Sequence, residues 1–176
     1  MPCILIVEDF PDAREMYEMY LVHQGYRVLT AGDGPSGIEM AITERPDLIF
    51  MDAGLPGMSG WEAVQALKSD ARVRDIPVFM LTGHVLADSR DLAHAAGADG
   101  FLSKPCLPDD LVQVIQRTLA AGADRREHER LQKRTDELKA EHAGLARDKT
   151  PFNQADHNRH AQKLKQHSKD LRRHRK

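Results

Sequence analysis

Short apolar runs alternate with helix-like segments along residues 3–119, and this alternation limits the folds that the chain can adopt. The runs that we predict as strands cover residues 3–7, 26–31, 47–51, 76–81 and 100–103. The segments that we predict as helices cover residues 12–23, 34–44, 60–69, 87–96 and 108–119. Strands that alternate with helices form a parallel sheet covered on both faces. The pattern therefore predicts an α/β fold built from five βα units joined by right-handed crossovers.

Charge is distributed unevenly along the chain, although the formal net charge is only -2. Residues 1–122 hold 9 Lys and Arg and 18 Asp and Glu. Residues 123–150 hold 8 and 7 of these types, and residues 151–176 hold 8 and 2. We interpret the three segments as an acidic domain, a charged helical extension and a basic, His-rich tail.

Nothing in the sequence predicts export or a membrane span. The first residues, "MPCILIVEDF", lack a basic region, and Glu8 and Asp9 interrupt their apolar stretch. No apolar run approaches the length of a membrane-spanning helix. Cys3 and Cys106 are too few for a disulfide framework. We therefore expect a cytoplasmic protein with reduced thiols and no membrane contact.

Side chains suited to chemistry follow the predicted strands at their carboxyl ends. Glu8 and Asp9 follow the first strand, Asp52 the third, Thr82 the fourth and Lys104 the fifth. Because ligand sites in open α/β sheets gather at these ends, we expect the five side chains at one edge. Taken singly, each of them is an ordinary loop, turn or capping residue. Their joint occurrence favours a functional site.

Three carboxylates at one edge repel each other and require a cation, and Mg²⁺ prefers oxygen ligands. An aspartate can attack phosphorus to form an aspartyl phosphate. Lys104 and Thr82 would then contact phosphoryl oxygens. Asp52 ends the apolar run "LIFM", so we expect the strand to hold it in a fixed position. Gly54 allows the backbone to approach closely enough to offer its carbonyl oxygen to the metal.

Four segments together are similar to a known family: "VEDFPDAR", "IFMDAGLPGMSG", "VFMLTGH" and "GADGFLSKPC". They resemble the receiver domain of bacterial two-component response regulators, over residues 3 to about 120. The resemblance implies a flavodoxin-like, doubly wound sheet of five parallel strands in the order 2-1-3-4-5. In this chain a C-terminal helical and basic extension would follow the sheet.

The resemblance also implies a role for each site residue. Asp52 would be the phosphoacceptor, and Mg²⁺ would bind Glu8, Asp9, Asp52 and the carbonyl of Gly54. Thr82 and Lys104 would contact the phosphoryl group, and the bond before Pro105 would be cis. Thr82 and Phe101 would act as switch residues, although Phe101 also fits an ordinary core position. Gly54 and His84 occupy positions that tune phosphoryl lifetime in the family.

The function implied is signalling rather than conventional enzyme activity. Asp52 would accept a phosphoryl group from a sensor histidine kinase or a phosphotransfer protein. Phosphorylation would then change a surface of helix four, strand five and helix five, which would contact a second copy or another partner. Self-phosphorylation and autodephosphorylation would be the only reactions that the protein catalyses.

Two other functions stay open at this point. The first is a Mg²⁺-dependent hydrolase with an aspartyl-phosphate intermediate, although Gly54 stands where such phosphatases place a second acid. The second is a flavin-binding electron carrier, although the acidic loop "EDFPDAR" suits a cation rather than a phosphate.

The segment 123–150 predicts either a weak coiled coil, able to form a homodimer, or a single helix that continues from the fifth helix of the domain. Leu131, Leu138 and Leu145 lie seven residues apart, and Thr135 and His142 occupy the alternate positions.

The tail has several interpretations: disorder, contact with nucleic acid or acidic partners, or docking on the acidic domain. It lacks any nucleic-acid-binding motif, so sequence-specific recognition is poorly supported. Histidines seven residues apart on a helix are about 10 Å apart, too far to share one metal ion. One helical stripe holds His160, Leu164, His167, Leu171 and His174.

Overall fold

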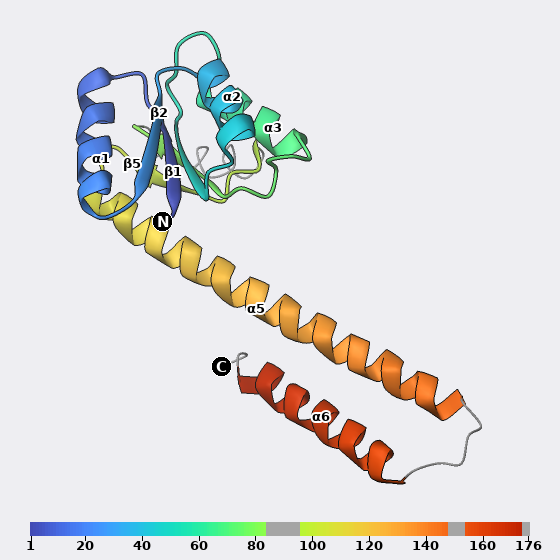
Figure 1. The fold of residues 1–176 in the computed structure, drawn as a ribbon. Coiled ribbons are helices and arrows are strands. Elements are labelled where there is room, and N and C mark those ends of the chain that lie inside the picture. Colours follow the sequence, from blue (N-terminus) through green and yellow to red (C-terminus); the bar gives the residue numbers. More distant parts are fainter. Residues whose placement is uncertain (84–95, 148–153, 174–176) are drawn as a thin grey trace. The chain divides into compact units, whose positions relative to one another are not determined.

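The computed structural model describes residues 1–83, 96–147 and 154–173. The chain divides into two compact units, Met1–Thr118 and Leu119–Lys176. The first unit holds a sheet with helices on both faces, and the second holds the continuation of one long helix and a further helix (Figure 1). The sequence places the boundary after residue 122, and the structure places it after Thr118.

Five parallel strands form the sheet, in the order β2-β1-β3-β4-β5. This order confirms the predicted flavodoxin-like architecture. The connection changes direction between β1 and β3, which lie side by side, and ligand sites in such sheets gather at this switch point. The strands are β1 (Cys3–Val7), β2 (Arg27–Ala31), β3 (Leu48–Asp52), β4 (Val78–Thr82) and β5 (Gly100–Ser103).

Helices cover both faces of the sheet, so β1 and β3 are buried along their whole length. Leu5 and Val7 share a core cluster with residues of α2 (Gly34–Glu44) and α3 (Gly60–Ser69). Neighbouring residues of a strand point to opposite faces. Ile4 and Ile6 of β1 therefore face α1 (Pro11–His23) and the first turns of α5, which lie on the other side of the sheet (Figure 1).

Local signals in the sequence explain where α2 and α3 begin. Asp33 caps α2, because its carboxylate accepts a hydrogen bond from the amide of Ser36 at 2.8 Å. Ser59 and Glu62 form a capping box at the start of α3. Each cap satisfies an amide that would otherwise lack a partner at the first turn.

The third and fourth strands end one residue later than predicted. Asp52 pairs with Leu81, and Thr82 pairs with Ser103, so Asp52 and Thr82 belong to the strands themselves. The fourth strand also begins later than predicted, at Val78, because Pro77 has no amide to donate to the ladder. The helix predicted over residues 87–96 falls almost wholly outside the described residues.

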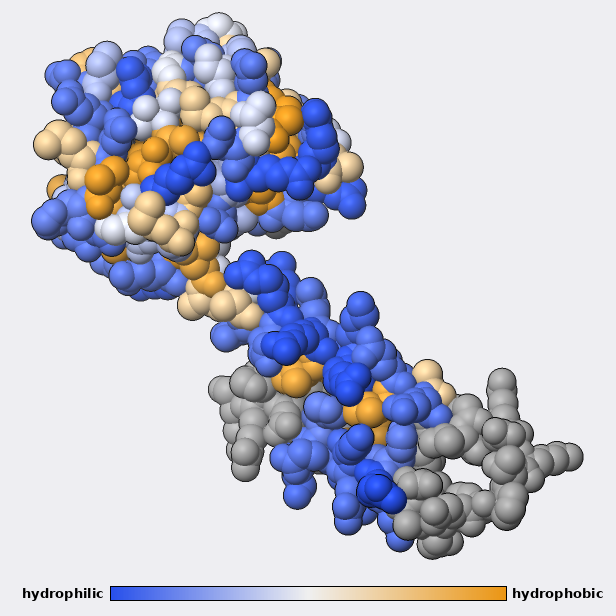
Figure 2. Space-filling view, viewed as in Figure 1, coloured by the Kyte–Doolittle hydropathy of each residue, from blue (hydrophilic) through white to orange (hydrophobic). Residues whose placement is uncertain are grey.

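The sequence suggests an apolar side of α1 formed by Met16, Met19, Tyr20 and Val22, but a different side packs on the sheet. Tyr17 and Leu21 are buried, whereas Met16, Met19 and Val22 are 44%, 67% and 54% exposed. Apolar residues occur on more than one side of this helix, so their spacing did not identify the buried face. Figure 2 shows hydrophobic residues among hydrophilic ones on the drawn surface of the first unit.

The second unit consists of helix throughout its described part. Helix α5 runs from Pro108 to Arg147 and is followed by α6 (Gln154–Arg173). Thus α5 continues past residue 119 as a single helix, which was one of the two alternatives for this segment. Most of the tail is also helical, where the sequence left disorder as an alternative. No helix within the described ranges combines the length and the apolar character needed to cross a membrane.

Two residues of α5 that lie three positions apart are buried in the second unit. Thr135 and Leu138 are buried, and the Thr135 hydroxyl donates a hydrogen bond to the carbonyl of Leu131 at 2.9 Å. From α6, Nε2 of His160 lies 3.1 Å from Oε2 of Glu141. The stripe of histidine and leucine in the tail therefore includes a residue that contacts α5. Hydrophilic residues dominate the drawn surface of these helices (Figure 2).

Gly37 tests how closely α2 packs on β1. A β-carbon at Gly37 would lie 2.7 Å from Cγ2 of Val7, which is fully buried and cannot withdraw. We expect Gly37→Ala to lower the free energy of unfolding by about 1–3 kcal/mol, measured by urea denaturation. Gly122→Ala is the control, because its β-carbon would meet only Nη1 of Arg126, at 3.8 Å. Unchanged stability of Gly37→Ala would contradict the close packing.

Candidate functional site

The carboxyl edge of the sheet brings the predicted site residues together. In the strand register, Val7 pairs with Met51, so Glu8 and Asp52 follow at the same level of two neighbouring strands. Thr82 and Ser103 form the last pair of β4 and β5, and Lys104 comes directly after it. Each side chain is thus placed by the end of a strand rather than by a long loop.

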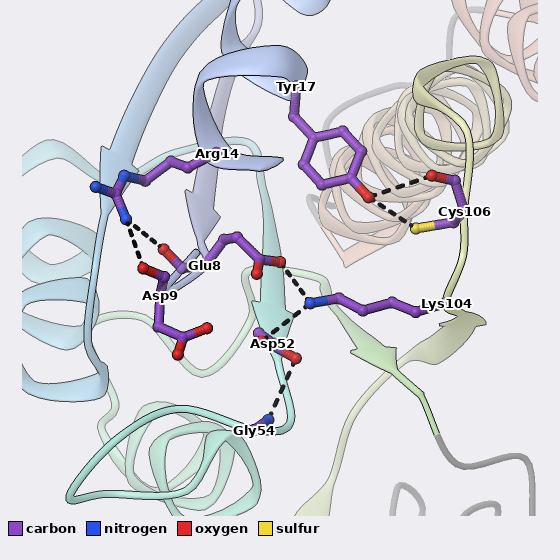
Figure 3. Close-up of polar contacts among 8 residues, drawn as sticks. All are labelled: Glu8, Asp9, Arg14, Tyr17, Asp52, Gly54, Lys104 and Cys106. Atoms are coloured by element: carbon purple, nitrogen blue, oxygen red, sulfur yellow. Dashed lines mark hydrogen bonds and ion pairs between the residues drawn. The ribbon is translucent and has the colours of Figure 1, made fainter. Parts of the chain in front are cut away.

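Glu8, Asp9 and Asp52 form a cluster of acids at this edge. Each offers a carboxylate oxygen, and the three oxygens lie within 4.8 Å of one another. Glu8 and Asp52 are only 1% and 6% exposed, whereas Asp9 is exposed. Figure 3 shows the three carboxylates converging on one space from β1 and β3. The predicted group of three acids is therefore present.

Lys104 is the cation that contacts this cluster. Its Nζ lies 2.6 Å from Oε2 of Glu8 and 3.0 Å from Oδ2 of Asp52 (Figure 3). One ammonium group thus bridges the two buried carboxylates from neighbouring strands. Buried carboxylates are costly unless a cation or hydrogen-bond donors accompany them, and Lys104 meets that need.

The pKa values of Glu8 and Lys104 are both raised, but for different reasons. Burial raises the pKa of Glu8 above its usual range, and the hydrogen bond from Lys104 offsets this only in part. Burial disfavours the ammonium form of Lys104, yet its hydrogen bonds and attraction to Glu8 and Asp52 outweigh that cost. The pKa of Lys104 is therefore raised, so Lys104 stays charged at neutral pH.

Two glycines shape the loop after Asp52. The amide of Gly54 donates a hydrogen bond to Oδ1 of Asp52 at 3.2 Å, a contact that the sequence analysis did not anticipate. Gly60 is the position where close approach is essential. A β-carbon there would lie 1.9 Å from the carbonyl oxygen of Asp52. The start of α3 therefore presses directly on the backbone of the acidic residue.

Three residues near the site were missed by the sequence analysis. Nη1 of Arg14 donates hydrogen bonds to the carbonyls of Glu8, at 2.6 Å, and Asp9, at 3.4 Å. The Tyr17 hydroxyl donates to the carbonyl of Cys106 and also lies 3.2 Å from its Sγ. Burial, together with Cys106, raises the pKa of Tyr17, so its hydroxyl stays protonated. No sequence signal marks these contacts, because each depends on a backbone carbonyl.

The other predicted residues occupy the same edge or its support. Thr82 is the buried last residue of β4, and its carbonyl accepts a hydrogen bond from the amide of Lys104 at 2.7 Å. Phe101 in β5 is half-buried against the core, which also agrees with an ordinary core position. The bond between Lys104 and Pro105 is cis, the isomer that the resemblance implies. His84 lies outside the described residues.

The donor set fits a hard divalent cation. It consists of carboxylate oxygens from Glu8, Asp9 and Asp52, with no sulfur or imidazole ligand in the same described cluster. Oxygen ligands and an exposed side that leaves room for water are the surroundings that Mg²⁺ prefers.

Residues 4–116 match the family model of the response regulator receiver domain. The chain belongs to this family. Receiver domains act in two-component signalling and interact with histidine kinases or phosphotransfer partners. Of the functions that the sequence left open, the match supports the two-component response regulator.

Individual relatives agree with this assignment. PhoB of Klebsiella pneumoniae, a phosphate regulon transcriptional regulatory protein, is 38% identical over 116 residues, which are 66% of this chain and 51% of PhoB. The chain spans about half the length of PhoB and of other curated transcriptional regulators that it matches. Its similarity to them therefore concerns their receiver part.

Two solved structures show the same fold. The chemotaxis response regulator CheY4 of Vibrio cholerae is 34% identical, with a TM-score of 0.64 over 67% of this chain and 98% of that chain. The receiver domain of a sensor histidine kinase from Pseudomonas aeruginosa is 32% identical, with a TM-score of 0.63 over 68% of this chain and 98% of that chain. The latter holds a magnesium ion coordinated in its active-site cleft.

Lys104→Met tests whether Lys104 compensates the buried acids of this receiver domain. Without the ammonium, Glu8 loses its bridging cation, and its pKa rises further above the usual range. We expect the free energy of unfolding at neutral pH to fall by about 2 kcal/mol. Breaking a fully buried ion pair costs more, but the Lys104 side chain is 27% exposed, so solvent screens part of its interaction. A raised carboxyl pKa has no effect on stability below the ordinary carboxyl pKa, and its destabilising effect is complete only above the raised pKa, so the loss should shrink as the pH falls to about 5.

The measurement is urea denaturation of Lys104→Met and of the original chain at both pH values. Lys139→Met is the control, because Lys139 pairs with Asp136 at 3.5 Å on an exposed helix surface. An equal loss for Lys104→Met at both pH values would contradict the electrostatic origin of the effect.

Proposed function

We propose that this receiver domain accepts a phosphoryl group on Asp52. The observation that supports this assignment most directly is the environment of that carboxylate. Oδ2 faces the ammonium of Lys104 at 3.0 Å, and Oδ1 accepts the amide of Gly54 at 3.2 Å. Glu8 and Asp9 each offer a carboxylate oxygen within 4.8 Å of one from Asp52. A carboxylate held in this way is oriented for attack while charge-neutralising groups surround it.

The reaction is a transfer from a phosphodonor to the carboxylate. An oxygen of Asp52 forms a bond to phosphorus, and the bond from phosphorus to the donor atom breaks. The leaving group, an imidazole of a phosphohistidine or a carboxylate of an acyl phosphate, departs with the electron pair. Hydrolysis reverses the modification when water attacks the same phosphorus and Asp52 leaves.

Mg²⁺ would be held by Glu8, Asp9, Asp52 and the carbonyl of Gly54, and when bound it would neutralise charge on the phosphoryl oxygens. Lys104 supplies a second positive charge at the same edge. Because Lys104 already contacts Asp52, its ammonium needs only a small movement to reach a phosphoryl oxygen. The Thr82 hydroxyl, on the next strand, serves as a hydrogen-bond donor to another oxygen.

Phosphorylation replaces one carboxylate charge by about -1.5 to -2 charges and adds strong acceptors. Thr82 and Lys104 would be drawn toward this group, and Phe101, which pairs with Met80 in the register of β4 and β5, would change its packing. The amide of Lys104 is bonded to the carbonyl of Thr82, so the two residues shift together. The output would pass to a surface formed by β5, α5 and the helix predicted over residues 87–96. Almost all of that helix lies outside the described ranges.

The proposal also covers the partners of the protein and its location in the cell. The phosphodonor in the cell would be a sensor histidine kinase or a phosphotransfer protein, and the protein would be cytoplasmic, with no membrane contact. Two copies would associate through the β5–α5 surface or through the C-terminal helices. The tail over residues 151–176 has 8 basic and 2 acidic residues, which would allow non-specific contact with nucleic acid. Self-phosphorylation from small donors and autodephosphorylation complete the proposal.

Asp52→Asn tests the phosphoacceptor. Incubation with acetyl phosphate and Mg²⁺ should add one phosphoryl group to the original chain, detected by intact mass, and none to Asp52→Asn. Asp12→Asn is the matched control, because Asp12 lies in the first turn of α1, outside the acidic cluster. It should be labelled normally. Retained labelling of Asp52→Asn would disprove the assignment.

Thr82→Ala separates phosphorylation from switching. We expect this variant to accept a phosphoryl group, since Asp52 and Lys104 remain, but to lose the change in self-association. Sedimentation velocity of the full chain with and without beryllofluoride, a phosphoryl mimic, measures this change. The original chain should associate when the mimic is added, and Asp52→Asn should not. An unchanged response of Thr82→Ala would show that Thr82 is not the switch residue.

A further inference from the structure

Arg14 is the one arginine of the described residues whose side chain contacts the backbone of the acidic loop. Its Nη1 lies 2.6 Å from the carbonyl oxygen of Glu8 and 3.4 Å from that of Asp9. Figure 3 shows the guanidinium on the backbone side of these residues, while both carboxylates point toward the cluster with Asp52. No ion pair links Arg14 to an acid among the described contacts. The Arg14 side chain thus contacts the backbone carbonyls of Glu8 and Asp9 rather than their carboxylates.

Backbone hydrogen bonds fix the peptide units on either side of those that Arg14 contacts. The amide of Glu8 donates to the carbonyl of Ala31 at 3.0 Å, which ties the end of β1 to β2. The amide of Arg14 donates to the carbonyl of Phe10 at 3.0 Å and so begins the first turn of α1. Arg14 therefore belongs to a rigid helix and reaches back to the strand end. Its guanidinium closes a short loop that carries two acids of the cluster.

Gly32 provides the space in which the guanidinium lies. A β-carbon at Gly32 would be 3.3 Å from Nη1 and 3.8 Å from Cζ of Arg14. Contacts near 3.3 Å are tighter than usual, so any side chain at position 32 would push the flexible end of Arg14 away. The arrangement needs both an arginine on α1 and a glycine after β2.

We propose that Arg14 is a positioning residue: it holds the Glu8–Asp9 peptide so that both carboxylates face the divalent cation, and Gly32 makes room for it. This inference rests on the metal-binding part of the proposed function. Residues that orient metal ligands typically contribute about 10–100-fold to metal affinity. Arg14 differs from such residues in acting through the backbone of its ligands rather than through their side chains.

A purely electrostatic effect would have the opposite sign. A guanidinium near the site repels a divalent cation, so its removal would then tighten metal binding, most strongly at low salt. Positioning predicts weaker binding when the same charge is removed. The direction of the change in affinity therefore separates the two explanations.

The experiment measures Mn²⁺, as a probe for the Mg²⁺ site, from the free-ion signal in electron paramagnetic resonance. Full-length Arg14→Gln should bind Mn²⁺ about 10-fold more weakly than the original chain. Arg14→Lys, which keeps the charge and a donor, should recover part of the affinity. Gly32→Ala should weaken binding less than Arg14→Gln. Arg72→Gln is the control of equal charge change, because Arg72 pairs with Asp70 before β4, at the opposite edge of the sheet.

Circular dichroism establishes that each variant is folded under these conditions. A second readout needs no metal: ¹⁵N relaxation should show added motion at the amides of Asp9 and Phe10 in Arg14→Gln and in Gly32→Ala. Unchanged or tighter Mn²⁺ binding by Arg14→Gln would overturn the inference, and so would unchanged relaxation. If the original chain bound no Mn²⁺, the proposed metal site itself would fail, and the relaxation measurement alone would decide the role of Arg14.

Discussion

The repulsion among three carboxylates at the end of a buried strand pair is the constraint on which the site depends. Glu8 and Asp52 lie at neighbouring strand ends because β1 and β3 are adjacent in the sheet. Their burial would be costly without a cation, and no basic residue is available on those two strands. Lys104 approaches from β5, across β4, and bridges both acids with one ammonium. The strand order and a single long side chain therefore have to act together to make this edge stable before any metal binds.

The fold was predictable where burial leaves one interpretation. The run "CILIV" is apolar throughout and "LIFMD" is apolar up to Asp52, which a strand covered on both faces explains well. The buried face of α1 was not predictable, because Met16 and Met19 match the apolar spacing as well as Tyr17 and Leu21 do. The length of α5 was open for a related reason. Beyond residue 119 its sequence is highly charged, so no apolar face indicates where the helix ends.

The acidic cluster could be predicted because side chains at strand ends obey a simple geometric rule. Contacts made by backbone groups follow no such rule, and these were missed. Gly60 is a glycine that close approach requires, since it packs against the carbonyl of Asp52. Tyr17 meets Cys106 from 89 residues away, and Arg14 contacts the carbonyl of Glu8. A backbone acceptor has no residue identity, so a sequence pattern cannot name it.

The bridging position of Lys104 also explains how a local modification could act at a distance. In the unmodified site its ammonium is shared between Glu8 and Asp52, while its own amide is bonded to the carbonyl of Thr82. A phosphoryl group on Asp52, as proposed, would compete with Glu8 for this ammonium because it carries more charge. Any shift of the Lys104 backbone that follows would pull on the end of β4 and on the start of the segment leading to α5. The group that stabilises the acids is thus the same group that links their charge to the outer strands.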